Sequence, residues 1–198
     1  FNIGGALGDS SWLEPGEVPI CSVHGVQDPF APYMNGTVFV PGTTFAVVNV
    51  DGSGRVTQLA NEYGNNDIWL NPPFTDVVTT NAQTALMGTV NEGNEGLYPI
   101  TALQNASGPW EWWDTTAVVA GCAALGIDQA GAYQRMGNGY ASNPLLSALG
   151  TVNGRLRAKA YVDTLQNFIT PRMYRALELN VGIAENSAIA NGVKVYPN

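Results

Sequence analysis

Short apolar runs closed by glycine mark the first third of the chain. Residues 1–8 (FNIGGALG) and 18–25 (VPICSVHG) are continuous apolar stretches, a pattern typical of buried parallel strands. Residues 36–40 (GTVFV) and 43–50 (TTFAVVNV) are rich in β-branched and aromatic residues, and a Pro-Gly pair separates them. The pattern therefore predicts strands in all of these segments, and we interpret the last two as an excursion from the main sheet.

The clearest helical pattern covers residues 50–66 (VDGSGRVTQLANEYGNN). Ser53 is suited to cap its N-terminus and Gly64 to end it. The apolar positions with helical spacing share one face, namely Val56, Leu59, Ala60 and Tyr63. Residues 67–71 (DIWLN) then predict another strand. This order of strand, helix and strand is typical of an α/β sheet with crossover connections.

The second half of the chain is predicted to be mainly loop and helix. Residues 72–108 read as a loop with one helical patch at 81–88 (NAQTALMG). Further helices are predicted from Trp112 to Gly126, over residues 143–150, and from Arg155 to Leu177, where Pro171 breaks the helix and Thr170 caps its second piece.

Composition and charge narrow the class of protein. The 198 residues are 45% hydrophobic, enough for one buried core, and only 12% charged, against about 25% in typical domains. The net charge of −8 argues against a nucleic-acid or anionic-membrane partner. No apolar run approaches the roughly 18 residues that span a bilayer. Seven of the eight basic residues lie in the last third. We expect six of them to form a solvated helical face: Arg135, Arg155, Arg157, Lys159, Arg172 and Arg175.

The first candidate catalytic residue is Asp28, which lies four residues after His24, the only histidine in the sequence. The acid of a serine hydrolase lies on a loop at the C-terminal end of a buried strand, where its carboxylate orients an imidazole. Asp28 meets these conditions, because it follows an apolar strand and a Gly25 turn.

The stretch GALGDSSWLEPGEVPICSVHGVQDPFAPY, residues 5–33, resembles the second half of a secreted α/β-hydrolase of the esterase/lipase type. The resemblance covers residues 1–70 and implies that residues 1–180 form the C-terminal part of a mostly parallel hydrolase sheet with helical and loop-rich additions. It places Asp28 at the triad acid position and makes His24 a packing and turn residue. No functional residue is carried over from residues 71–180.

The rest of such a triad is missing from this sequence. The family's G-x-S-x-G nucleophile elbow is absent, and no histidine follows Pro29. In the family the base follows the last strand, and Asn94 stands at that place if residues 67–71 are the strand. An Asn amide cannot act as a general base, so we expect an esterase-like protein that lacks the catalytic histidine. The alternatives left open are that Glu92, Glu95 or a residue from another chain serves as the base.

The alternative is a cell-surface structural or binding protein that uses the same fold as a scaffold. Its adhesive surface would combine the Asn/Thr-rich loop with Trp110, Trp112 and Trp113. A self-contained small β-rich binding domain is a third, weaker interpretation.

Other chemistry-bearing patterns favour structural roles, and we expect no cofactor or metal. GDSSW resembles the start of SGNH esterases, but that family needs a later Asp-x-x-His, so Ser10 is interpreted as a turn residue. DGSG at residues 51–54 does not continue as a calcium loop, and we interpret it as a helix cap. Cys21 and Cys122 are interpreted as buried free thiols, with a single disulfide as the alternative.

The last residues, NGVKVYPN, resemble the opening of a type IX secretion sorting domain. Residues 181–198 would then be a linker and the start of that domain. The resemblance implies a Bacteroidota-type protein exported by the type IX machinery across the outer membrane and then secreted or held at the cell surface. We also expect Phe1 not to be the natural start, and the sheet to be completed by an N-terminal half or by another chain.

Overall fold

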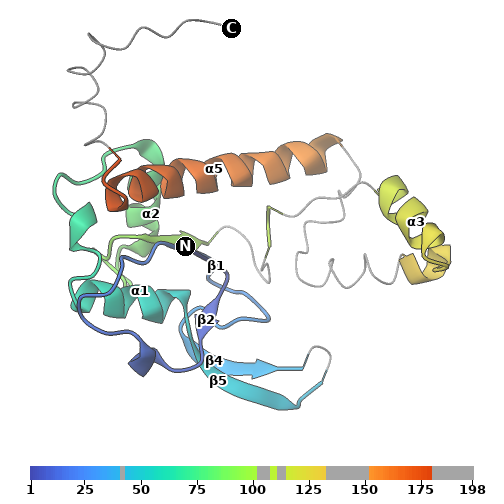
Figure 1. Ribbon diagram of the computed structural model, residues 1–198, viewed down its shortest axis with the longest axis horizontal. Coiled ribbons are helices and arrows are strands. Elements are labelled where there is room, and N and C mark those ends of the chain that lie inside the picture. The colour runs from blue at the N-terminus through green and yellow to red at the C-terminus, as the bar shows by residue number, and fades with distance from the viewer. Residues whose placement is uncertain (41–42, 102–107, 111–114, 133–151, 180–198) are drawn as a thin grey trace, which may run out of the picture.

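The computed structural model describes residues 1–40, 43–101, 108–110, 115–132 and 152–179 (Figure 1). It is a mixed α/β structure with a three-stranded parallel sheet, a separate three-stranded antiparallel sheet and several helices. The parallel sheet is the middle layer in Figure 1, with α1 (Ser53–Glu62) on one side and α2 (Val77–Leu86) and α5 (Val152–Ala176) on the other. None of the described helices is long and apolar enough to cross a membrane.

The parallel sheet has the order β1-β3-β6 and is built from β1 (Asn2–Ile3), β3 (Ser22–Gly25) and β6 (Leu97–Ile100). The predicted strand at residues 18–25 is confirmed only over its second half, as β3, which lies in the centre of the sheet. Residues 1–8 do not form a single buried strand. Gly4, with φ of 65°, turns the chain after β1, and β2 (Ala6–Leu7) then joins the other sheet.

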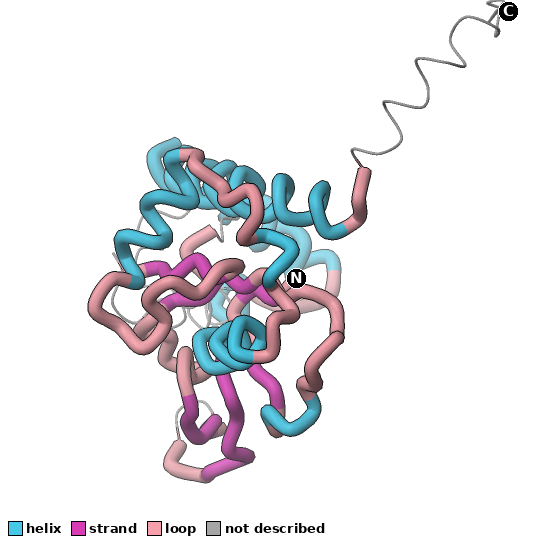
Figure 2. Tube along the Cα trace, turned by 90° about the vertical axis from the view of Figure 1, so that its left-hand side faces the viewer, coloured by secondary structure: helices cyan, strands magenta, loops and turns pink. Residues whose placement is uncertain are grey.

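The second sheet has the order β2-β5-β4, with β4 (Asn35–Phe39) and β5 (Ala46–Gly52) in an antiparallel hairpin. The predicted excursion from the main sheet is therefore confirmed. Figures 1 and 2 show this hairpin projecting away from the helices that cover the parallel sheet.

The predicted strand at residues 67–71 is wrong. Residues Asp67–Trp69 form a 3-10 turn, and the third parallel strand is β6, in the segment interpreted as loop. The cause lies in Trp69, whose ring is buried in the core while its Nε1 donates a 3.0 Å hydrogen bond to the main-chain oxygen of Arg172 in α5. An extended strand would not direct this ring into the space between the sheet and α5.

The helices lie near the positions that the sequence pattern predicts, but the residues at which they begin or that cap them differ. α1 buries Val56, Leu59 and Ala60 as predicted, and Gly64 with φ of 74° follows its end. Its N-cap is Gly52, however, and Ser53 makes no capping hydrogen bond. α2 begins earlier than predicted, because the carboxylate of Asp76 accepts from the main-chain N–H of Thr79.

The C-terminal helix α5 continues through Pro171. The predicted break and the Thr170 cap are therefore wrong. Buried side chains anchor the helix on both sides of the proline, with Phe168 1% and Arg172 0% exposed. Arg172 thus also departs from the predicted solvated basic face. α3 (Thr115–Ala124) matches part of the predicted helix from Trp112, whereas Trp112 itself and residues 143–150 lie outside the described residues.

The two faces of the parallel sheet have different chemistry. Cys21 and Val23 of the central strand region pack with α2 and α5 in the larger core cluster, together with Trp69, Ile100 and Phe168. On the other face β3 presents polar groups to α1: the Thr57 hydroxyl donates to Ser22 Oγ at 3.0 Å, and His24 contacts Ser53. The polar layer between β3 and α1 is the setting of the candidate site.

Candidate functional site

His24 and Asp28 contact each other at the C-terminal end of β3. His24 Nε2 lies 3.5 Å from Asp28 Oδ2 and 3.1 Å from the main-chain oxygen of Ala31. Both side chains are buried, at 0% and 2% exposure. Asp28 is therefore placed where the sequence pattern expected it. The sequence interpretation of His24 did not include its contact with Asp28, although the spacing of four residues across the Gly25 turn was visible.

Ser53 completes a buried polar network on the other side of the imidazole. Its Oγ lies 2.7 Å from His24 Nδ1 and 3.0 Å from the main-chain oxygen of Gly5, and it accepts a hydrogen bond from Asn2 Nδ2 at 3.1 Å. Ser53 is 0% exposed. The network joins β1, β3, the first turn of α1 and the loop after β3, and we call it the Ser53–His24–Asp28 network.

The residue types are those of a catalytic triad, but the arrangement is not. In a triad Nε2 faces the serine and Nδ1 faces the acid, and the serine is open to substrate. Here Nδ1 faces the serine, and Nε2 donates to the Ala31 carbonyl, which can only accept. Because Ser53 Oγ and His24 are both sealed from solvent, the arrangement holds four segments together and gives a substrate no access to the serine.

The carboxylate of Asp28 organises the loop that follows it. Its Oδ1 accepts from the main-chain N–H groups of Phe30 at 2.8 Å and Ala31 at 3.0 Å. Burial acts to raise the pKa of this carboxyl, but the hydrogen bond from His24 and the two amide donors outweigh it, so the pKa is lowered from its ordinary value. Asp28 is therefore held as a carboxylate.

Asn94 is not brought into this network. It precedes β6, the last strand of the parallel sheet in the described chain, instead of following it. Its Nδ2 donates to Asn91 Oδ1 at 3.0 Å, and its main-chain oxygen accepts from Gln83 at 3.0 Å. Its described hydrogen bonds thus go to α2 and its own loop, and none joins it to Asp28.

Glu95 and Arg172 form a buried pair that the sequence patterns missed. Arg172 Nε donates to Glu95 Oε1 at 2.7 Å, and its guanidinium carbon lies 3.6 Å from the centre of the Phe168 ring. Glu95 is thereby committed to an ion pair in the core and does not serve as a base. The only signal for this ion pair in the sequence is the position of Arg172 beside an apolar face of its helix.

The remaining candidates have mainly packing roles. Trp110 is half-buried and packs against the larger core cluster, while Trp112 and Trp113 lie outside the described residues. Ser10 lies in a 3-10 turn, and its N–H donates to Asp51 Oδ2 at 2.9 Å. Cys21 is a buried free thiol, and burial raises its pKa to about 12; Cys122 is free and half-buried.

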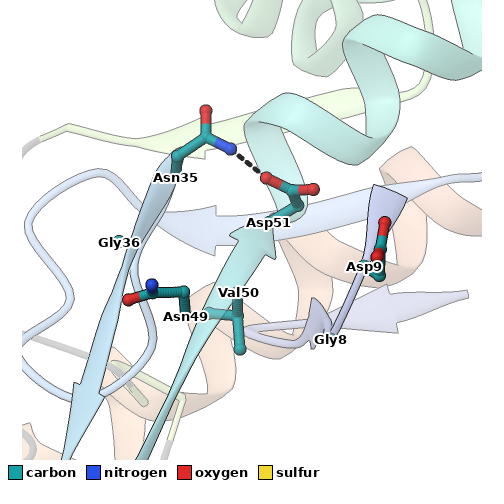
Figure 3. Close-up of a pocket in the computed structure, with 7 residues that line it drawn as sticks. All are labelled: Gly8, Asp9, Asn35, Gly36, Asn49, Val50 and Asp51. Atoms are coloured by element: carbon teal, nitrogen blue, oxygen red, sulfur yellow. Dashed lines mark hydrogen bonds between the residues drawn. The ribbon is translucent and has the colours of Figure 1, made fainter. Parts of the chain in front are cut away.

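A separate polar pocket of about 400 Å³ opens beside the β4–β5 hairpin (Figure 3). Its lining combines two carboxylates and two amides with glycine and valine: Gly8, Asp9, Asn35, Gly36, Asn49, Val50 and Asp51. Among the described residues no group of three or more His, Cys, Asp or Glu side chains is placed to hold a metal ion.

In comparisons with protein-family models, curated proteins and solved structures, nothing matches this chain.

Proposed function

We propose that this chain forms the C-terminal part of an α/β-hydrolase-like sheet in an exported, esterase-type protein that lacks a catalytic histidine. The observation that carries the proposal is the position of Asp28, which follows the central parallel strand at its C-terminal end and is held as a carboxylate. In open α/β sheets this edge is where functional groups gather. The resemblance in residues 5–33 supports the esterase type.

The lack of a base rests on the state of His24. It is the only histidine in the sequence, it is fully buried, and hydrogen bonds engage both of its ring nitrogens. A general base has to reach the proton it removes from a nucleophile in contact with substrate. The imidazole that faces Asp28 is therefore structural, and this chain has no other histidine to act as the base in acyl-serine chemistry.

In the described part of the chain no strand pairs with the outer edge of β1, which supports the idea that further strands complete the sheet. The N–H groups of Asn2 and Gly4 donate to β3, so the N–H and C=O of Ile3 face the outer edge of β1. Ile3 is 49% exposed, and it borders a groove of about 580 Å³ lined also by Trp110, Val162, Ile169 and Met173. An N-terminal half or another chain would add a strand here and cover the groove. Export by the type IX machinery rests on the VYPN resemblance at residues 195–198.

Hydrolysis of p-nitrophenyl acetate by the purified, folded protein tests this proposal. We expect wild type and Asp28→Asn to release p-nitrophenol at the same rate as buffer, since neither has a base to activate a serine. Turnover by wild type that Asp28→Asn lowers about 100-fold or more, without unfolding, would contradict the proposal.

A further inference from the structure

The polar pocket beside the hairpin carries chemistry that the hydrolase resemblance does not use. Asn35 lies directly opposite Asp51 across β4 and β5, and Thr37 lies opposite Asn49. Because alternate residues of a strand share a face, all four side chains belong to one face of the hairpin. Figure 3 shows Asn35 and Asp51 joined across the strands, with Asn49 further along the same hairpin and Asp9 on the neighbouring segment.

The hydrogen bonds within the pocket define which atoms remain available to a ligand. Asp51 Oδ1 accepts from Asn35 Nδ2, and its Oδ2 accepts from the Ser10 N–H. The Thr37 hydroxyl donates to Asn49 Oδ1 at 2.6 Å, which leaves the Nδ2 of Asn49 without a partner among the described residues. In the same described part of the chain, Asn35 Oδ1 receives no hydrogen bond. The pocket therefore offers both a donor and an acceptor, as well as the exposed carboxylate of Asp9.

An exposed aromatic ring lies against Gly8, one of the residues that line this pocket. Trp12 is 66% exposed. It is the last residue of a short 3-10 turn whose N-cap is Asp9, and the Asp9 carboxylate accepts a hydrogen bond from the Ser11 N–H. The six-membered part of its ring lies against Gly8, where an added Cβ would come within 3.1 Å of it. Trp12 itself is not one of the lining residues, but Gly8 is, so the ring adjoins the pocket through this glycine.

We propose that this surface binds a neutral carbohydrate chain, with Trp12 stacking on a sugar ring and Asn35, Asn49 and Asp9 bonding its hydroxyls. A hydroxyl both donates and accepts, which matches the mixed groups of the pocket. An anion is disfavoured by two carboxylates and the net charge of −8. A metal ion is disfavoured because, among the described residues, no group of three or more His, Cys, Asp or Glu side chains is placed to hold one. The flat, exposed face of Trp12 suits the apolar face of a pyranose ring.

Isothermal titration of the full chain with cellohexaose, xylohexaose and mannohexaose tests this site. We expect saturable binding of at least one hexasaccharide, weakened about tenfold by Trp12→Ala and by Asn49→Ala, since each removes one stacking or hydrogen-bonding partner. Trp12→Phe keeps a ring and should lose less affinity than Trp12→Ala. Phe45→Ala is the matched control, because Phe45 is an exposed aromatic residue near the same hairpin, at 73% exposure, that does not line the pocket.

Circular dichroism of each variant separates loss of binding from loss of folding. Wild-type protein that is folded and binds none of the three hexasaccharides would overturn the proposal. So would binding that Trp12→Ala and Asn49→Ala leave unchanged, or that Phe45→Ala weakens as much as Trp12→Ala does. Ester hydrolysis is a separate readout, so failure of this site leaves the hydrolase proposal to its own test.

Discussion

Arg172 shows at the scale of a single residue how this chain tolerates charge in its core. The guanidinium is fully buried between α2, α5 and the start of β6, where it pairs with Glu95 and donates to the main-chain oxygen of Phe168 at 2.8 Å. It also lies over the rings of Phe168 and Phe74. Because Glu95 and Phe74 lie outside α5, their contacts with Arg172 fix how α5 sits on the sheet.

Removing one member of this pair leaves the other charged and buried. We expect Arg172→Met to lower the free energy of unfolding by about 3–5 kcal/mol, measured by urea denaturation. Lys159→Met is the matched control in the same helix, since Lys159 pairs with Asp163 at the surface and should cost no more than about 0.5 kcal/mol. A loss below about 1 kcal/mol for Arg172→Met would mean that the buried pair does not hold α5.

Asp28 makes a pH-dependent contribution to stability. Its pKa is lower in the folded chain than in the unfolded chain, so its carboxylate stabilises the fold at pH values above the ordinary pKa, and this contribution is lost as pH falls through the lowered value. Asp28→Asn keeps an oxygen acceptor for Phe30 and Ala31 but removes the charge. We expect it to cost about 1–2 kcal/mol at pH 6 and progressively less below about pH 4.

Urea denaturation of wild type and Asp28→Asn between pH 3 and pH 7 measures this difference. A difference that stays constant over the whole range, or grows as the pH falls, would contradict a lowered pKa for Asp28.

At the scale of elements, the sequence predicted those segments whose pattern is long or purely local. The apolar run before Gly25 and the helical spacing from Val56 to Ala60 were sufficient for β3 and α1. β6 was missed because a four-residue strand that contains Pro99 reads as loop. The structure accommodates Pro99 because the N–H groups of Tyr98 and Ile100 are the ones on the side of β3, so the proline interrupts no bond of this ladder.

Of the residues in the candidate site, only the acidic residue, Asp28, was predictable from the sequence. Asp28 follows from a local pattern. Ser53, by contrast, reaches His24, and Asn2 reaches Ser53, through a packing of β1, β3 and α1 that no local pattern encodes. α5 shows the same limit, since the break expected at Pro171 is overridden by buried contacts of Phe168 and Arg172 on either side.

The start of β6 depends on Gly96, which has φ of 87° and no space for a side chain. An added Cβ would lie 2.7 Å from both the main-chain oxygen of Ile20 and the ring of Trp69. We expect Gly96→Ala to lower the unfolding free energy by about 2–5 kcal/mol, from backbone strain and overpacking together. Gly88 has φ of 74° with nothing within 4 Å, so Gly88→Ala should cost only the backbone strain, about 1–2 kcal/mol.

Thermal and urea denaturation of the two glycine variants side by side measure the steric part of this cost. Equal losses for Gly96→Ala and Gly88→Ala would show that the contact with Ile20 and Trp69 does not constrain β6.

At the scale of the whole molecule, the surface has one apolar region and one polar region of interest. The outer edge of β1 and the groove beside it are apolar and fit the addition of a further strand. The hairpin pocket is polar and bordered by an exposed tryptophan. The Ser53–His24–Asp28 network has the side chain types of a serine hydrolase, but it is buried and connects β1, β3 and α1. The proposed loss of catalysis depends on this network being structural.

Treatment of the folded chain with a fluorophosphonate probe, followed by peptide mass spectrometry, tests that dependence most directly. The probe reacts with a serine that a base has activated. The account predicts no labelled peptide, because Ser53 is sealed and His24 is engaged through both ring nitrogens. A label on Ser53, or on any other serine in protein shown to be folded, would contradict it and make the chain an active serine hydrolase.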